Sequence, residues 1–173
     1  MSPNIHRTIT FTLTRKDIDR AIREVKDFGR QISAWCNDLV KALTEEGVTV
    51  AKMNVMHLNA VYTGELEESI QGVFFPSEGK GVIFTDCPHA LFVEFGTGIV
   101  GEQGPQHPML QAFDWKHDIH KHGDSGWVYY LETDNVNQFR WTKGMASRPF
   151  MYNTLRWLEE NAQRIADSTP FKE

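Results

Sequence analysis

The sequence has 173 residues, a formal net charge of −5 and 40% hydrophobic residues. This length suits a single domain, residues 1–173, that can bury a core without disulfides or metal. The negative charge excludes a general electrostatic attraction to nucleic acid. The chain shows no run of eighteen apolar residues and no basic-then-apolar leader, so we expect no membrane insertion and no export, and synthesis in the cytoplasm.

The N-terminal third predicts a strand and then a long helix. Residues 5–14 alternate apolar side chains with threonines, which is the two-residue period of a half-buried strand. Thr14 can cap a helix over residues 15–46, with Asp17 favourable to its N-terminus and Gly47 as its end.

The expected helix carries an apolar stripe wider than the seam of a two-stranded coiled coil. Its two columns are Ile18, Ile22, Val25, Gly29, Ile32, Cys36, Leu39 and Leu43, and beside them Ala21, Phe28, Trp35 and Ala42. Two interpretations remain open. The stripe either makes one broad internal contact, or it packs on the domain's own sheet and on a neighbouring subunit.

The middle of the chain predicts a short helix and a hairpin. Thr63 is a candidate cap, and the first turn that follows contains Glu65, Glu67 and Glu68, where acidic groups complement the helix dipole. Two short apolar runs at residues 72–76 and 81–85 then predict a β-hairpin.

The remaining segments predict a loop, a second hairpin and a closing helix. Residues 96–108 hold four glycines and two prolines and should be a loop, whereas 127–131 and 138–142 flank Asp134 and Asn135 as an aromatic hairpin. The apolar side of the last helix comprises Met151, Leu155, Leu158, Ala162 and Ile165. From Asp167 we expect a loose tail. The predicted fold class is α+β: a small antiparallel sheet packed against one long N-terminal helix and a C-terminal helix, with an inserted aromatic hairpin.

Two stretches carry most of the functional information. In residues 89–98 an apolar segment with a single carboxylate, Glu94, stops at Gly96-Thr97-Gly98, so Glu94 should lie at the mouth of a turn. In residues 146–150, Pro149 follows Arg148 and opens the closing helix, as proline does in a first turn.

The strongest candidate for a metal site is the segment from His107 to His122. Imidazole and carboxylate are ligands that zinc prefers, and the segment supplies His107, His117, His120 and His122, with Asp114, Asp118 and Asp124. The spacing matches no recognised ligand pattern, so we expect structural or solvated histidines and no bound metal. A metal-dependent hydrolase or nuclease built on this segment is the alternative.

Other chemistry finds little support in the sequence. His89 and Glu94 would point to different faces of a helix, and no nucleophile elbow or phosphate-binding glycine loop is present. The two cysteines, Cys36 and Cys87, are expected to be reduced and partly buried. We therefore expect no enzyme and no cofactor.

Three motifs in order resemble the neck or tail-completion proteins of long-tailed phages, which are often labelled tail components or minor capsid proteins. The motifs are Thr63-Gly64-Glu65-Leu66-Glu67-Glu68-Ser69-Ile70, then Ala90-Leu91-Phe92-Val93-Glu94-Phe95-Gly96-Thr97, then Arg148-Pro149-Phe150. The departures are His89, where the family usually has tyrosine, and residues 107–142, which look like an insertion.

The resemblance implies a structural virion protein, made in the host cytoplasm, that forms a ring at the head-to-tail junction or the top of the tail. It would contact neighbouring neck and tail proteins, and contact with DNA in the lumen stays open. The candidate partner or subunit interface comprises Phe92, Glu94, Phe95, Gly96, Arg148 and Phe150. We hypothesise a charged pair between Glu94 and Arg148, within one chain or across two; the alternative is two unrelated surface charges.

Overall fold

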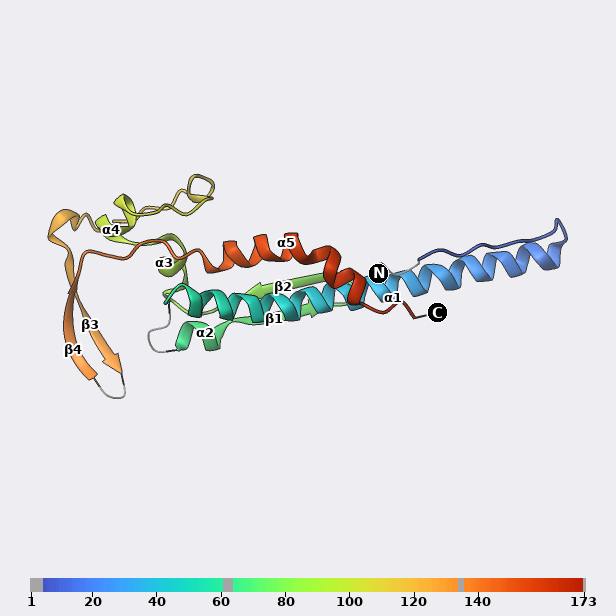
Figure 1. The fold of residues 1–173 in the computed structure, drawn as a ribbon, viewed down its shortest axis with the longest axis horizontal. Helices are drawn as coiled ribbons and strands as arrows, with labels where there is room; N and C mark the ends of the chain where they lie inside the picture. The colour runs from blue at the N-terminus through green and yellow to red at the C-terminus, as the bar shows by residue number, and fades with distance from the viewer. Residues whose placement is uncertain (1–4, 61–63, 134–135, 173) are drawn as a thin grey trace. The chain divides into compact units, whose positions relative to one another are not determined.

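The computed structural model describes residues 5–60, 64–133 and 136–172. Its α-helices are α1 (Arg15–His57), α2 (Glu65–Ser69), α3 (Ala90–Phe95), α4 (Gly98–Gln103) and α5 (Phe150–Ser168). The strands form two separate antiparallel hairpins (Figure 1), β1 (Gln71–Phe75) with β2 (Lys80–Phe84), and β3 (Trp127–Thr133) with β4 (Val136–Thr142). The α+β class, the long first helix and the closing helix are thus confirmed.

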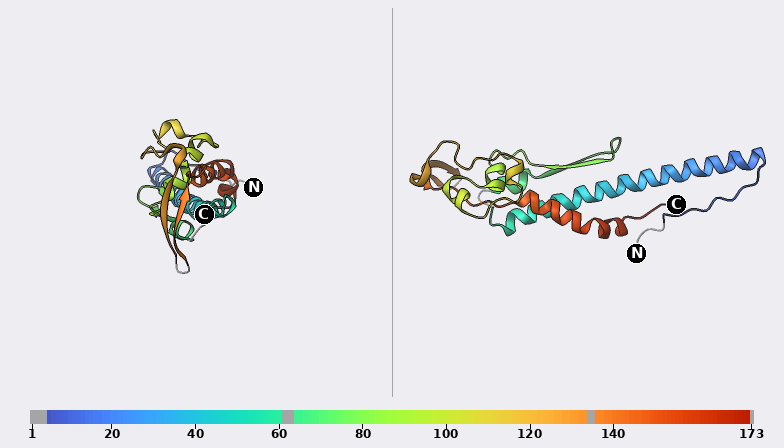
Figure 2. Two further views of the ribbon diagram at one scale, coloured as in Figure 1. Left: turned by 90° about the vertical axis from the view of Figure 1, so that its left-hand side faces the viewer. Right: turned by 90° about the horizontal axis from the view of Figure 1, so that it is seen from above.

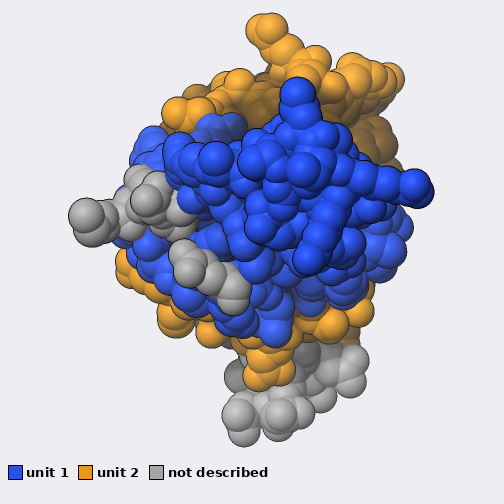
Figure 3. All heavy atoms as spheres, turned by 90° about the vertical axis from the view of Figure 1, so that its right-hand side faces the viewer, with its two compact units in different colours: residues 1–47, 72–83, 157–173 blue, residues 48–71, 84–156 orange. Residues whose placement is uncertain are grey.

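The chain divides into two compact units (Figure 3). Unit 1 comprises residues 1–47, 72–83 and 157–173, and unit 2 comprises 48–71 and 84–156. Each unit brings together segments that are distant in sequence. Residues 107–142 belong entirely to unit 2, and their status as an insertion into a single domain stays a prediction.

The prediction that residues 5–14 form a strand is wrong. In the part of the chain that the structure describes, this segment is extended but pairs with no strand, and Leu13 is 91% exposed. An alternating pattern needs a partner strand to satisfy its backbone groups, and none is adjacent here. The Thr14 cap is confirmed, because Thr14 Oγ1 accepts a hydrogen bond of 3.2 Å from Asp17 N.

The first helix does not end at Gly47 but continues to His57. In unit 1 this glycine allows the hairpin and α5 to approach α1, since a Cβ there would overlap Ile83 Cδ1 and lie 3.1 Å from Leu158 Cδ1. Figures 1 and 2 show β1–β2 and α5 beside α1 in this unit. Packing therefore overrides the roughly 1 kcal/mol that glycine costs a helix interior.

The tail differs from the loose segment expected after Asp167. Within unit 1, Thr169 is buried and its carbonyl accepts a hydrogen bond of 3.0 Å from Trp35 Nε1. The rings of Phe171 and Phe28 meet edge to face, with centroids 6.2 Å apart.

Two burial predictions for the helices of the chain turn out differently. Cys36, on α1, is exposed and not partly buried as expected. On the last helix Ile165 is buried as predicted, whereas Leu155 is 49% exposed.

In unit 2 the predicted short helix is confirmed as α2, with Glu65, Glu67 and Glu68 in its first turn and Gly64 at its N-cap position, while the candidate cap Thr63 lies outside the described residues. The expected loop over residues 96–108 is wrong in part, because it contains α4. The side-chain amide of Gln106 donates to the carbonyls of Gly101, Glu102 and Gly104 at the end of this helix. The Gln106 side chain thus supplies hydrogen bonds to carbonyls at the end of α4, where the glycine-rich composition had suggested an irregular loop.

The second hairpin is confirmed. Its register pairs Trp127 with Thr142 and Tyr130 with Phe139; Asp134 and Asn135 lie outside the described residues. Among the helices in the described part of the chain, none has an apolar stretch of the length needed to cross a membrane.

Candidate functional site

The site centres on Glu94, in unit 2. This residue lies on the short helix α3, which ends at Gly96 with φ 80° and ψ 165°. Val93, Glu94 and Phe95 are all buried, and Glu94 is only 6% exposed. A buried carboxylate requires partners, because burying an unpaired charge costs several kcal/mol or more.

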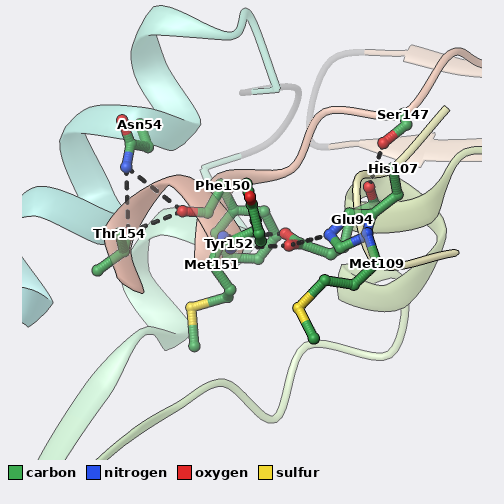
Figure 4. A network of polar contacts seen from close by, with 9 residues as sticks. All are labelled: Asn54, Glu94, His107, Met109, Ser147, Phe150, Met151, Tyr152 and Thr154. Atoms are coloured by element: carbon green, nitrogen blue, oxygen red, sulfur yellow. Dashed lines mark hydrogen bonds and ion pairs between the residues drawn. The ribbon is translucent and has the colours of Figure 1, made fainter. Parts of the chain in front are cut away.

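Both oxygens of the Glu94 carboxylate have partners on distant segments (Figure 4). Oε2 accepts a hydrogen bond of 2.9 Å from Met151 N, and Oε1 accepts one of 2.9 Å from Tyr152 N. Oε1 also lies 3.0 Å from His107 Nε2. The first amides of a helix have no partner within it, and the helix dipole favours negative charge there. Glu94 therefore caps the N-terminus of the 19-residue helix α5 from another segment of the chain.

The neighbouring backbone holds the same two segments together. Ser147 Oγ donates to Glu94 O at 2.6 Å, and Arg148 N donates to Val93 O at 2.8 Å. Thr97 and Met145 exchange two backbone hydrogen bonds, of 2.9 and 3.0 Å. The two sequence motifs thus meet within one chain. We call the contact of residues 93–97 with residues 145–152, together with the His107 side chain that is hydrogen-bonded to Glu94, the glutamate clamp.

Gly96 permits the close approach on which the clamp depends. A Cβ at this position would lie 2.7 Å from Ser147 N and 2.8 Å from Met145 O, both of them backbone atoms. The Gly96 carbonyl also accepts a hydrogen bond of 2.9 Å from Trp115 Nε1. Gly96 is therefore required for two reasons: a side chain would collide with the backbone of residues 145–147, and its positive φ favours glycine.

The first turn of α5 has a second attachment in unit 2. Asn54 Nδ2 donates to Phe150 O at 3.3 Å and to Thr154 Oγ1 at 3.1 Å (Figure 4). The helix begins directly after Pro149, as predicted, and Asn153 N donates to the Pro149 carbonyl at 2.9 Å.

The hypothesis of a charged pair between Glu94 and Arg148 is wrong within one chain, and a pair across two chains stays a prediction. Over residues 5–60, 64–133 and 136–172 no ion pair joins these two side chains, and the contact of Arg148 with α3 runs through its backbone. The alternative of two surface charges is wrong for Glu94, which is buried. The helix N-terminus takes the place of the guanidinium.

The six candidate interface residues divide into two groups. Glu94, Phe95, Gly96 and Phe150 are buried inside unit 2 and serve the clamp, so they are internal residues and not surface groups. Phe92 is 42% exposed, with its ring 5.9 Å from that of Trp115, and Arg148 is half-buried. A subunit contact stays a prediction for these two.

His107 belongs to the clamp and not to a histidine cluster. Its Nδ1 accepts a hydrogen bond of 3.0 Å from Met109 N, which assigns the ring proton to Nε2, the donor to Glu94. Its ring packs against Phe95, with centroids 4.4 Å apart, and edge to face against Tyr152. Both ring nitrogens of this neutral histidine are therefore hydrogen-bonded, one as donor and one as acceptor.

The rest of the histidine-rich segment does not converge on a point. His122 Nδ1 lies 3.1 Å from Asp118 Oδ1, and its ring packs 5.6 Å from His120 and 4.8 Å from Trp127. Within the described residues, the group of three potential ligands with convergent donor atoms lies elsewhere, at Glu65, Cys87 and His89. Sequence reasoning missed this group because Glu65 is distant in sequence from the other two.

Asp118 organises the turn that follows it, and we expect Asp118→Ala to loosen that turn. Its carboxylate accepts hydrogen bonds from the amides of Gly123 (2.7 Å) and His122 (2.9 Å), and these bonds hold the pKa of Asp118 below its usual value. A lowered folded-state pKa gives stability that is present above the unfolded-state value and is lost as the pH falls through the folded-state value. Hydrogen exchange should therefore show less protection of both amides in the variant, and in the wild type as the pH falls through the lowered folded-state pKa of Asp118.

The matched control for this turn is Asp124→Ala. Asp124 is an exposed carboxylate in the same segment. Equal exchange of the His122 and Gly123 amides in the two variants would contradict the anchoring role of Asp118.

Comparison of the chain with protein-family models, with curated proteins and with solved structures found no match.

Proposed function

We propose that this protein is a structural subunit of a tailed-phage virion, a neck or tail-completion protein that assembles with copies of itself, as a ring, at the head-to-tail junction. The order of the three motifs supports this role. The single observation that carries it is the exposed apolar stripe on the first half of α1, in unit 1.

The stripe is left uncovered where α1 begins. Ile22 is 47% exposed and Val25 is 59% exposed, and Ile18 lies on the same face one turn earlier. A Cβ at Gly29 would have no atom within 4 Å, so the face is open there too. Contiguous exposed apolar surface marks interaction sites in soluble proteins. Of the two interpretations of the wide stripe, this half of the helix favours a neighbouring subunit.

The second hairpin, in unit 2, presents a further apolar face. Because side chains alternate along a strand, Val128 and Tyr130 share a face with their cross-strand partners Trp141 and Phe139. All four are more than half exposed, Phe139 at 75%. Aromatic residues of this kind are enriched at the centres of protein interfaces. The hairpin is suited to contact with adjoining neck or tail proteins.

The clamp supports a structural role for its own residues. Both carboxylate oxygens of Glu94 and both ring nitrogens of His107 hold structural hydrogen bonds. A general acid or base must instead reach a substrate proton. The geometry therefore uses these groups to fix the chain, and the alternative of a hydrolase on residues 107–122 gains no support from it.

The role of α1 is tested by the double variant Ile22→Gln, Val25→Gln. Glutamine is a good helix former, so the helix should persist while the apolar contact is lost. Burying each such side chain stabilises an interface by about 1.5–3 kcal/mol, so self-association should weaken at least about tenfold. Native mass spectrometry and analytical ultracentrifugation over a range of concentrations would measure this change.

The control is Arg23→Gln, on the opposite side of α1, which should leave the assembly unchanged. A wild-type chain that stays monomeric at the highest concentrations tested and is missing from the neck and tail of purified particles in cryo-electron microscopy would refute the proposal. Equal self-association of the double variant and the control would refute the assignment to α1.

A further inference from the structure

Three potential metal ligands converge in unit 2, outside the glutamate clamp. Glu65 is the first residue of α2, Cys87 lies in the connection after β2, and His89 directly precedes α3. Their donor atoms, one carboxylate oxygen, one sulfur and one ring nitrogen, all lie within 4.8 Å of one another. Cys87 Sγ is 3.2 Å from His89 Nδ1 and 3.3 Å from Nε2.

We propose that Glu65, Cys87 and His89 bind a divalent transition-metal ion of the Zn²⁺ class, which links the start of α2 to the start of α3. In a tetrahedral zinc site with bonds of about 2.0–2.3 Å, neighbouring ligand atoms stand roughly 3.3–3.8 Å apart. The three donors are already close to that spacing. Small rotations of the side chains would complete it, with a water or a further ligand in the fourth position.

The backbone around the three ligands is held in place without the ion. Ser69 Oγ, at the end of α2, lies 2.6 Å from Thr85 Oγ1, and the latter accepts a hydrogen bond of 3.1 Å from Cys87 N. Ala90 N donates to Cys87 O at 3.0 Å, and Val93 N donates to His89 O at 3.1 Å. These bonds fix α2, the connection and α3 relative to one another, so the cost of ordering the ligands is already met by the fold.

The chemistry of the donor set selects the class of ion. A thiolate with an imidazole and a carboxylate suits zinc and related transition ions, whereas magnesium and calcium prefer oxygen ligands alone. Burial raises the pKa of the Cys87 thiol, and the carboxylates of Glu65 and Asp86 add to this effect. A divalent cation would reverse that balance, since it stabilises the thiolate and pairs with Glu65, with release of the thiol proton to solvent.

The ion would act on the same helix that carries Glu94. His89 stands at the N-terminus of α3 and Glu94 near its C-terminus, so a metal bond at His89 would hold the helix that caps α5. We therefore assign the ion a structural role within unit 2. This role does not depend on the proposed place of the protein in a virion.

The test is Co²⁺ binding to the full chain, purified without a histidine tag, in a Cys36→Ser background that leaves Cys87 as the sole thiol. We expect one Co²⁺ per chain with thiolate-to-Co²⁺ charge-transfer absorption in the near ultraviolet, and displacement of the Co²⁺ by Zn²⁺. Adding Cys87→Ser should abolish the absorption. His89→Gln or Glu65→Gln should lower Zn²⁺ affinity more than about 100-fold, because even loss of a partner outside the ligand shell costs 10–100-fold.

Three results would overturn the proposal. The first is Co²⁺ uptake without thiolate absorption in the Cys36→Ser protein, which would indicate binding through the histidine-rich segment. The second is the absence of any Co²⁺ uptake, and the third is unchanged Zn²⁺ affinity in His89→Gln. Circular dichroism verifies the fold of each variant, and should Cys87→Ser not fold, the affinities of the His89 and Glu65 variants decide. His120→Gln is the matched control and should bind as tightly as the background protein.

Discussion

Glu94→Ala should lower the free energy of unfolding of unit 2 by about 2–4 kcal/mol, because loss of a helix cap costs about 0.5–2 kcal/mol and each buried donor left unsatisfied costs about 1–3 kcal/mol. The substitution leaves the amides of Met151 and Tyr152 without their acceptor and the buried Nε2 of His107 without its partner. It also leaves a cavity where the side chain was. Urea denaturation would give the free energy, and hydrogen exchange should show the amides of Met151 and Tyr152 losing their protection first.

Two further variants make this prediction specific. Glu94→Gln keeps the shape and one acceptor oxygen, so its loss should be smaller than that of the alanine variant. Glu102→Ala removes an exposed carboxylate from nearby α4 and should change stability by less than about 0.5 kcal/mol. If Glu94→Ala behaves like Glu102→Ala, the carboxylate does not hold the clamp, and α5 is fixed by its apolar contacts alone.

The regular elements follow from local sequence patterns, which is why most of them could be predicted. The apolar period of α1, the aromatic alternation of β3 and β4 and the proline before α5 each depend on near neighbours in the chain. The wrong predictions concern segments whose structure depends on contacts with parts of the chain that are distant in sequence. Residues 5–14 alternate as a strand would but have no adjacent strand, and Gly47 lies inside α1, where a side chain would overlap Ile83 and crowd Leu158.

The candidate site shows the same division. Glu94 stands out in the sequence as the lone carboxylate of an apolar segment, yet the sequence suggested the wrong partner. A cationic side chain such as that of Arg148 can be read from the sequence. The partners that Glu94 has in the structure are backbone amides at the N-terminus of α5, and no residue type identifies them in the sequence. The contact with Met151 spans 57 positions and with Tyr152 58, and sequence periodicity carries no information on contacts of that length.

Gly96→Ala should lower the free energy of unfolding by about 3 kcal/mol or more, as much as many truncations of core side chains do. Its φ of 80° with ψ of 165° lies in a region open almost only to glycine, where another residue pays about 1–3 kcal/mol in backbone strain. The new methyl would also meet Ser147 N at 2.7 Å and Met145 O at 2.8 Å. Because both are backbone atoms, neither can turn aside as a side chain would.

The matched control is Gly29→Ala, a glycine in the interior of α1 whose Cβ would meet open space. This variant should be more stable than the wild type by roughly 0.5–1 kcal/mol, the helix-interior difference between the two residues. Urea denaturation of both variants checks the opposite signs. A Gly96→Ala protein as stable as the wild type would mean that residues 145–147 can move away from α3 at little cost.

The Gly96 variant also tests whether the clamp acts as one structure. The methyl at position 96 pushes against the segment that leads into α5, and so it should displace the amides that Glu94 accepts from. Neighbouring substitutions that disturb one network are not additive, with coupling energies of about 0.5–3 kcal/mol. The double variant Glu94→Ala, Gly96→Ala should therefore lose less stability than the sum of the two single variants. Additive losses would show instead that the carboxylate and the glycine hold α5 by independent means.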